Sequence, residues 1–413
     1  MRLLAGPRGY ESVSEHRKRL GPRPQGGGHL VDVLRESGLR GRGGAWFPTW
    51  RKWAAVREHS GGNAVVVVNG HEGEPLSAKD RVLLQMRPHL VLDGAALAAE
   101  TLGASQVILY LSRDAGETDQ AVRRALAERQ NLEEPPVGVE RSAHRYVAGE
   151  ASAVVGRVSG AQSKPRFTLV RMAQKGVNDQ PTLVQNAETL AHVALIARYG
   201  PAWFRRLGTD ASPGTTLMTL SGNVKRPGVY EVDLGATIGA VVRDVGGTVS
   251  PPAGALLGGY FGSWLGPETL DGLPLDVDRL RTTYGAAFGC GILAVLPQGG
   301  CAIVESTRIL AYLAAESAGQ CGPCVNGLAA LAETMQRIAS SNPEFGDIDR
   351  VTRWIDMVRG RGACHHPDGA VGQLQSALTV FELHVRTHLL GHTCYGVRTV
   401  GFPRPPAPGD GWR

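Results

Sequence analysis

The chain has 413 residues, of which 42% are hydrophobic and 20% are charged, and its formal net charge is +6. This composition is that of a globular protein with enough chain for two or three cores, so we expect several domains. The charge is modest and no basic run alternates with aromatic residues, which excludes a typical nucleic-acid-binding surface.

The first half of the chain predicts a parallel α/β domain. Residues 1–28 are rich in Gly, Pro and Arg and are expected to form a flexible arm. Strand and helix patterns then alternate, which is typical of a parallel sheet and assigns residues 29–210 to one α/β domain. The predicted elements are a strand at 64–68, a helix at 80–102, a strand at 106–111, a helix at 119–130 and a short strand near 137.

The second half predicts two further domains and a tail. Short strands at 215–220 and 229–232 and a helix at 238–245 indicate a small α+β domain over residues 211–298. Helical periodicity at 301–317, 325–340, 347–360 and 370–390 indicates an all-α bundle over residues 299–391. The Pro-rich segment 392–413 is expected to be disordered or bound to a partner.

The location follows from what the chain lacks. Its longest uncharged apolar stretch, Gly285 to Pro297, is shorter than the roughly 18 to 20 residues of a membrane span. The N-terminus meets Gly6, Pro7 and Arg8 too early for the apolar core of a secretory signal. We therefore predict a soluble cytoplasmic protein whose six cysteines are thiols or metal ligands rather than disulfides.

A glycine-rich loop indicates a phosphate-bearing cofactor. Residues 38–45 read GLRGRGGA, with four glycines and two arginines. Glycines let backbone amides approach a phosphate, and arginines supply charge-assisted hydrogen bonds to it. Taken alone, the stretch is equally compatible with an ordinary surface loop.

Five ordered motifs carry a family resemblance. They are GLRGRGGAWFPTWRKW (38–53), VNGHEGEPLSAKDR (68–81), YVAGEASA (146–153), PTLVQNAETL (181–190) and ESAGQCGPC (316–324). Together they resemble the NADH-binding flavoprotein subunit of respiratory complex I, which is shared by NAD-linked hydrogenases and formate dehydrogenases. The resemblance runs from about residue 30 to 391. It implies a flavin domain, a ubiquitin-like β-grasp (SLBB-type) domain and a helical domain that carries an iron-sulfur cluster.

The resemblance implies a role for each matched residue. In the family, hydride passes from NADH to FMN, and single electrons leave through a 4Fe-4S cluster to a partner protein. Glu72 is expected to be a catalytic residue that contacts the flavin with Asn69 and Asn186. The matched phosphate loop is Gly41, Arg42, Gly43, Gly44 and Lys52, and the expected NAD(H) contacts are Phe47, Glu74, Glu150, Lys164 and Phe167.

Each match has an alternative interpretation. Glu72 and Glu74 could be solvated turn charges, although their place after the strand at 64–68 puts them where α/β proteins bind ligands. Phe167 alone is more often a core residue than a stacking platform. Its spacing to Lys164 is what favours a ligand contact.

Several positions depart from the family pattern. Trp46 and Trp50 stand where the family has glycine, and an indole there would stack on the flavin or fill its site. His71 replaces an acidic residue and would alternatively handle protons near the flavin. Ala151 replaces one glutamate of a pair and leaves Glu150 alone, which removes an NADH contact of about 1 kcal/mol or more.

The cysteine motif lacks one ligand. The family has four cysteines, but Ala318 occupies the first position and leaves Cys321, Cys324 and Cys364. Three outcomes remain open: an iron-sulfur cluster with another fourth ligand or with three irons, a zinc site with three thiolates and one imidazole, or no metal. The candidate fourth donors beside Cys364 are His365, His366 and Asp368.

The other cysteines carry weaker signals. Cys290 and Cys301 flank an apolar strand and are interpreted as core residues. Cys394 could hold a metal together with His388 and His392.

The leading hypothesis is an NAD(P)H-oxidising electron-transfer subunit that contains FMN and an iron-sulfur site. Its partner would be another subunit or an acidic, ferredoxin-like protein attracted to a basic surface. The alternative is a cofactor-poor paralogue with a structural or regulatory role.

Overall fold

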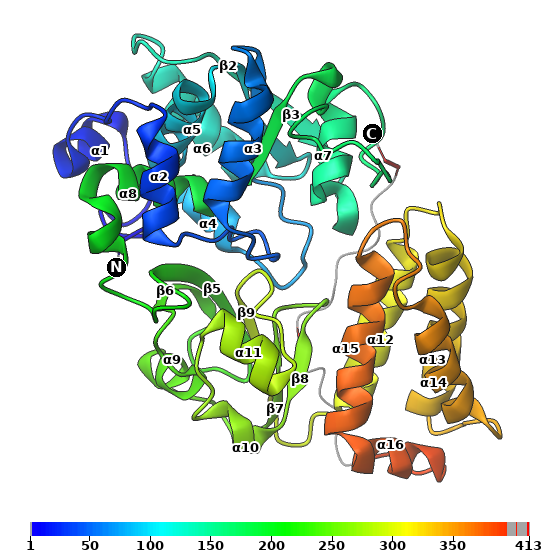
Figure 1. Ribbon diagram of the computed structural model, residues 1–413. Coiled ribbons are helices and arrows are strands. Elements are labelled where there is room, and N and C mark those ends of the chain that lie inside the picture. Colours follow the sequence, from blue (N-terminus) through cyan, green and yellow to red (C-terminus); the bar gives the residue numbers. More distant parts are fainter. Residues whose placement is uncertain (1, 395–401, 403–410, 413) are drawn as a thin grey trace.

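The computed structural model describes residues 2–394, 402, 411 and 412. Figure 1 shows an α/β part at the top, a second sheet below it and the C-terminal helices at the right. The first sheet is parallel and has the strand order β3-β2-β1-β4. Its strands are β1 (Ala64–Asn69), β2 (Ala104–Ser112), β3 (Val137–Ser142) and β4 (Thr182–Asn186). The mixed α/β class with a parallel sheet and a second sheet is therefore confirmed.

Alternation along β1 separates two cores. Val66 and Val68 face the larger core, whereas Val65 and Val67 face the smaller one, because successive side chains of a strand point to opposite faces. The helices that pack on the larger core are α2 (His29–Ser37), α3 (Thr49–Ser60), α4 (Lys79–Met86), α5 (Pro88–Leu102), α6 (Gly116–Glu128) and α8 (Ala187–Phe204). The opposite face is covered by α7 (Ala151–Val158).

The second sheet is mixed and has the order β6-β5-β9-β7-β8. Its strands are β5 (Thr215–Gly222), β6 (Gly228–Asp233), β7 (Pro252–Leu257), β8 (Ser263–Leu265) and β9 (Ile292–Pro297). The central pair β5–β9 is parallel, and the other pairs are antiparallel. One face packs on α9 (Ile238–Asp244) and α11 (Val277–Tyr284), and the short helix α10 (Pro267–Leu270) precedes α11.

The other face of this sheet packs on the C-terminal helices. Leu256, Ile292 and Ala294 share one core with α12 (Ala302–Ala315), α13 (Ala329–Ala339), α14 (Asp347–Val358) and α15 (His366–Val380). The last helix, α16 (Glu382–Leu389), lies across the end of this group (Figure 1). None of the helices in the described ranges is long and apolar enough to cross a membrane.

Two predicted helices are each divided. The predicted helix 80–102 ends at Met86 and restarts at Pro88, because proline lacks the N–H that would continue the helix and is favoured in a first turn. The predicted helix 370–390 begins earlier, at His366, and is broken at Phe381 between α15 and α16.

The prediction of a flexible arm over residues 1–28 is wrong for most of its length. Helix α1 (Val13–Leu20) begins with a capping box between Ser12 and Glu15. Leu3 is fully buried, and the carboxylate of Glu231 accepts hydrogen bonds from the backbone N–H groups of Arg2, Leu3 and Leu4. Composition alone could not show these distant partners.

The tail prediction fails at the described positions. Cys394 and Phe402 are buried, and the Phe402 ring stacks on Trp264 with a centroid distance of 5.6 Å. The carbonyl of Trp412 accepts a hydrogen bond from the Ser163 N–H at 2.8 Å. The remaining tail positions lie outside the described residues.

His16 fastens the N-terminal segment to α5. Its Nε2 lies 2.9 Å from Asp93 Oδ2, and its Nδ1 lies 3.2 Å from Glu11 Oε2. Burial opposes the charged ring, but the hydrogen bonds and charges of both carboxylates outweigh burial and raise the pKa of His16 above 6.5.

We expect His16→Gln to lower the free energy of unfolding by about 1.5 to 3 kcal/mol near pH 6. A raised folded pKa stabilises below the unfolded pKa of about 6.5, and this contribution is lost as pH rises through the folded pKa. The difference between parent and variant should therefore shrink above pH 6.5 in urea unfolding. His59→Gln on the exposed side of α3 is the control, and an unchanging difference would contradict the expectation.

Candidate functional site

The candidate site lies at the carboxyl ends of β1 and β4. Asn69 and Asn186 end these strands and are register partners. The chain crosses from β1 to β2 on one side, and β4 returns on the other side, so this edge is the topological switch point at which α/β sheets bind ligands. The predicted residues Asn69, Glu72 and Asn186 are thus brought together.

The glycine loop is held against this edge. The Gly41 N–H donates to the Phe47 carbonyl at 2.9 Å, and the Arg42 N–H donates to Thr189 Oγ1 at 2.8 Å. Gly41 and Gly43 have ordinary φ angles, and a Cβ there would meet no atom nearer than 3.6 Å and 3.4 Å, respectively. Packing of the protein therefore does not require glycine at either position. The space beside both glycines is therefore open to a ligand.

The Arg42 side chain has a structural role. The sequence predicts that it binds phosphate, but its guanidinium is buried and donates to the carbonyls of Arg40 and Thr215 at 3.1 and 3.0 Å. Burial lowers its pKa to about 10. Only the backbone of Arg42 faces the loop, so the predicted side-chain contact with phosphate is wrong.

Lys52 is the cation that remains for an anion at this edge. It begins the second turn of α3, and its Nζ has one acceptor among the described residues, the Val184 carbonyl at 3.5 Å. The side chain is accessible to solvent, yet surrounding protein lowers its pKa. An exposed ammonium with so little compensation suits an anionic ligand.

Neither tryptophan enters the site, contrary to the expectation from sequence. Trp46 has a left-handed backbone (φ 52°), and its side chain packs in the core of the second sheet, 5.1 Å from the Phe288 ring. Its Nε1 donates to the Gly289 carbonyl at 2.8 Å. Trp50 is partly buried and packs against the larger core beside Arg35. The site is therefore not filled by indole.

The polar residues of the edge also cap helices. The Asn186 oxygen accepts from the backbone at the start of α8, and its amide donates to Asp80 at 2.7 Å. The Glu72 carboxylate accepts from Ser77 and from the backbone N–H groups of Asp80 and Arg81 at the start of α4. Glu72 is therefore not a merely solvated turn charge.

A buried network of charged side chains, Lys79, Asp80 and Glu188, lies next to Asn186 and Glu72. Lys79 Nζ lies 3.0 Å from Asp80 and 2.9 Å from Glu188, and all three groups are buried. Burial raises the pKa of Glu188, but Lys79 outweighs this effect and brings it to about 2. The pKa of Asp80 rises to about 6, because burial and the neighbouring carboxylates outweigh Lys79.

The Glu74 carboxylate connects residues from the two sheet-containing parts of the chain. Its Oε2 accepts from the Tyr146 hydroxyl at 2.8 Å and from the Tyr260 N–H at 2.9 Å. The carboxylate is only partly exposed, and burial raises its pKa to about 7 despite these donors. Glu74 can therefore hold or release a proton near neutral pH.

His71 is not available for proton transfer, which excludes the alternative role predicted from sequence. The ring is buried, and burial lowers its pKa to about 4. Nε2 donates to the Arg145 carbonyl at 3.1 Å, and Nδ1 lies 2.8 Å from Ser142 Oγ. Both nitrogens are thus engaged by protein.

Three of the predicted NAD(H) contacts, Phe47, Glu150 and Phe167, are exposed, whereas Glu74 and Lys164 are half-buried. Phe47 and Phe167 are 44% and 75% exposed, which excludes the core interpretation of Phe167. Glu150 caps α7, whose first residue is Ala151. Lys164 Nζ lies 5.1 Å from the Trp412 ring, so the C-terminal end of the chain covers part of this surface.

Sequence reasoning missed Cys290, Tyr146 and Tyr260. Cys290 adjoins Gly44 and the carboxylate of Glu74, and burial raises the pKa of its thiol. It is therefore a neighbour of the site rather than a plain core residue. These contacts cross between domains, and no local pattern marks them.

Cys321, Cys324 and Cys364 surround one small cavity, which Ala318 and His366 also line. Within the described ranges, the three sulfurs do not lie within 4.8 Å of one another. Zinc bonds of about 2.3 Å would place thiolates about 3.8 Å apart, so the wider spacing favours a multinuclear cluster over a single zinc ion.

The three candidate fourth donors differ in placement. His365 is fully exposed, and Asp368 accepts the Gly360 N–H at 2.6 Å. His366 is buried, and its Nε2 donates to the Leu313 carbonyl at 2.8 Å. Its Nδ1 is buried and has no hydrogen-bond partner in the described part of the chain. A histidine held in this way is the arrangement that metal-binding imidazoles adopt.

Three segments match known families. Residues 34–195 match the Nuo51 FMN-binding domain, residues 217–257 match the SLBB domain, and residues 305–388 match the NADH-ubiquinone oxidoreductase-F iron-sulfur binding region.

Whole-length similarity agrees with these matches. The second F subunit of the NADH-quinone oxidoreductase of Rhizobium meliloti (strain 1021) is 32% identical, covering 88% of this chain and 90% of that protein. The corresponding F subunit of Streptomyces coelicolor is also 32% identical, covering 98% and 89%. A crystal structure of an NAD+-reducing NiFe hydrogenase in the H2-reduced state superposes with a TM-score of 0.81 at 30% identity. That match covers 89% of this chain but only 63% of the hydrogenase chain.

We expect Lys79→Met to lower the free energy of unfolding by about 3 to 5 kcal/mol, because it leaves Asp80 and Glu188 buried without a counter-ion. Lys18→Met on the exposed side of α1 is the matched control and should change stability by less than about 0.5 kcal/mol. Equal losses in urea unfolding would contradict the structural role of the network.

Proposed function

Because the chain belongs to the family of NADH-quinone oxidoreductase F subunits, we propose that it is an NADH-oxidising flavoprotein that passes electrons to a partner protein. The observation that carries this proposal is the glycine loop at the switch point, where Gly41 and Gly43 leave backbone open to a ligand. When bound, FMN would accept a hydride and a proton and release the two electrons singly.

The residues of the strand ends would bind and orient the flavin. The backbone of Gly43 and Gly44 and the ammonium of Lys52 would hold its phosphate, since the N–H groups of Gly41 and Arg42 already donate to Phe47 and Thr189. Asn69, Glu72 and Asn186 would set the position of the ring. Their hydrogen bonds to helix ends and to Gly149 hold these three side chains in fixed positions along one wall of the site.

The NADH surface would lie beside this wall. Exposed Phe47 and Phe167 would stack on planar groups of NADH, and Lys164 would pair with its phosphates. Glu74 would bond ribose hydroxyls and, with a pKa near 7, hold or release a proton on its carboxyl group. Glu150 would supply the single remaining carboxylate of the family's pair.

The second sheet supports the finer assignment of a ubiquitin-like β-grasp domain over residues 211–298. A parallel central pair flanked by two antiparallel hairpins, with α9 across one face, is the arrangement expected of that domain. Residues 299–391 would form the cluster-bearing helical domain.

The cavity among the cysteines would hold an iron-sulfur cluster. Cys321, Cys324 and Cys364 would supply three thiolates, and Nδ1 of His366 would replace the thiolate missing at Ala318. Histidine ligation of an iron-sulfur cluster raises its reduction potential relative to cysteine ligation.

The alternative of a cofactor-poor paralogue loses most of its support. Trp46 and Trp50 point away from the site, and both ring nitrogens of His71 are in hydrogen-bond contact with Ser142 and Arg145. Only Ala151 and Ala318 still favour it.

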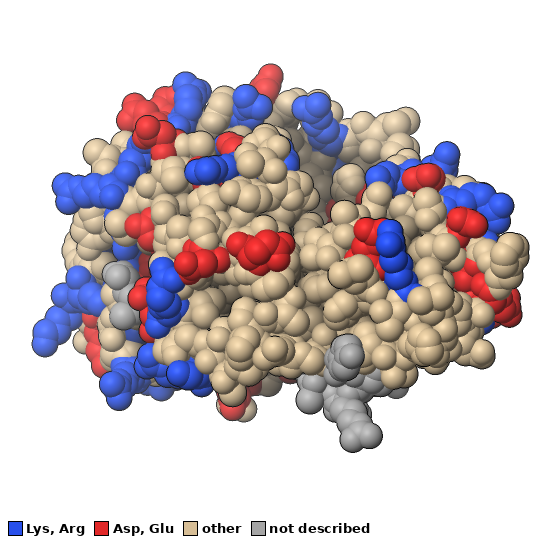
Figure 2. Space-filling model, turned by 90° about the horizontal axis from the view of Figure 1, so that it is seen from below, with Lys and Arg blue, Asp and Glu red and all other residues tan. Residues whose placement is uncertain are grey.

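The partner would be another subunit of an electron-transfer assembly in the cytoplasm, since the relatives are named as subunits. Figure 2 shows acidic and basic side chains interspersed on one face rather than a single basic patch. On that face, charge alone does not favour an acidic ferredoxin-like partner.

We expect Gly43→Ala to weaken FMN binding at least about tenfold without loss of stability. The added methyl group fits the protein, with its nearest atom 3.4 Å away, but occupies the space of a ligand against the backbone. Gly116→Ala at the open start of α6 is the control. The measurement is flavin fluorescence titration. Unchanged affinity in the Gly43 variant, or no flavin binding by the parent, would contradict the proposed function.

We expect His366→Ala to convert a 4Fe-4S cluster into a three-iron form in protein purified without air, because the fourth ligand is lost. His365→Ala should change nothing, and Ala318→Cys combined with His366→Leu should restore the 4Fe-4S cluster at a lower reduction potential. Iron analysis and EPR spectra distinguish the forms without any assay of activity. An unchanged spectrum in His366→Ala would assign the fourth ligand elsewhere.

A further inference from the structure

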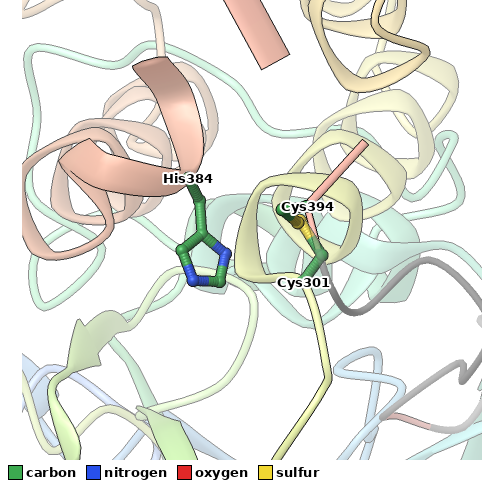
Figure 3. Close-up of side chains that lie close together, drawn as sticks. All are labelled: Cys301, His384 and Cys394. Carbon is green, nitrogen blue, oxygen red and sulfur yellow. The ribbon is translucent and has the colours of Figure 1, made fainter. Parts of the chain in front are cut away.

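A second cluster of ligating side chains lies in the C-terminal helices. Cys301 precedes α12, His384 lies on α16, and Cys394 follows α16, and their ligand atoms all lie within 4.8 Å of one another. Figure 3 shows the His384 ring with a nitrogen turned toward the two cysteines. Cys301 is a buried core residue, as the sequence predicts, and it also belongs to this group. The expectation that His392 joins Cys394 in a metal site is wrong, because His392 is exposed and outside the group.

His388 adds a fourth donor. It lies four residues after His384, so both rings project from the same side of α16. Its Nε2 lies 3.4 Å from Cys301 Sγ, and the side chain is fully buried. Two cysteines and two histidines are thus gathered from three segments of the chain.

The hydrogen bonds of His388 leave its Nε2 unprotonated, and Nε2 is the nitrogen that faces Cys301. Ser341 Oγ donates to the His392 carbonyl at 2.9 Å, so it accepts from His388 Nδ1–H at 3.0 Å. Nε2 then carries a lone pair toward Cys301. His384 Nδ1 is buried and has no hydrogen-bond partner among the described residues. A serine that orients an imidazole is a typical outer partner of a metal ligand.

We propose that Cys301, His384, His388 and Cys394 bind one Zn²⁺ ion. Zinc bonds of about 2.3 Å to sulfur and about 2.0 Å to nitrogen place tetrahedral ligands about 3.3 to 3.8 Å apart. Cys301, His384 and Cys394 lie within 4.8 Å of one another and need only a small contraction. His388 lies 3.4 Å from Cys301 but outside that group, so its ring has to move toward the other two ligands when the ion binds. Two thiolates balance the charge of the ion, which makes a neutral site suited to buried surroundings. Soft thiolates with imidazoles select zinc over magnesium or calcium.

This site is separate from the cavity of Cys321, Cys324 and Cys364. Cys301 stands at the start of α12, whereas those cysteines come after its end, and 14 helical residues span about 21 Å. The zinc would fasten the segment after α16 to the start of α12. The same segment leads to Phe402, which stacks on Trp264.

The test is metal analysis of the full chain purified under reducing conditions without added metal. We expect one zinc per chain, lost in Cys301→Ser and in His384→Ala, with iron and flavin content unchanged. His392→Ala is the matched control. Replacement of zinc by Co²⁺ should give the absorption of a tetrahedral site with two thiolates, which reports the ligand set directly.

Ser341→Ala tests the orientation of His388 without removing a ligand. It should weaken zinc binding about 10- to 100-fold in competition with a chromophoric chelator. Absence of zinc from the parent, zinc that survives Cys301→Ser, or a Cys301–Cys394 disulfide in the reduced preparation would overturn the proposal. Loss of zinc from Cys321→Ser instead would place the metal in the other cavity. None of these outcomes bears on flavin binding, which is measured separately.

Discussion

The ammonium of Lys79 is the interaction on which the arrangement of the two sheets depends. It neutralises Asp80 beside it and Glu188 at the start of α8. The other oxygen of Glu188 accepts from Thr216 Oγ1 and from the Leu217 N–H of β5, so one carboxylate joins the first domain to the second sheet. Since a buried carboxylate without a counter-ion is strongly unfavourable, the whole junction depends on this cation.

Side chains of this junction also position and enclose the polar groups of the candidate site. Asn186 is positioned by Asp80, and Glu74 is enclosed by Tyr146 of the first domain and Tyr260 of the second. Because the two sides of the junction contribute different donors and cations, the carboxyl groups of Glu74 and Glu188 differ in pKa. A raised pKa at Glu74 beside an ionised network is the kind of separation that functional sites use.

The C-terminal helices carry two cysteine groups at opposite ends of α12. One adjoins the first domain through Val147, which lines the cavity with Cys321 and Cys324. The other lies where α16 and the following segment return to Cys301. Under the proposed function, the first group would exchange electrons with the strand-end site, whereas the proposed zinc, which is redox-inert, would hold the second group together.

The sequence by itself determined the family, the parallel sheet, the glycine loop and the strand-end residues, because these signals are local runs of glycine, valine and short motifs. It also showed that Ala318 leaves the cysteine motif incomplete. Only the tertiary structure decided where Trp46 and Arg42 point, which histidine beside Cys364 is buried, and that Cys301 meets α16. Those outcomes depend on partners dozens to hundreds of residues away, and a local pattern does not encode them.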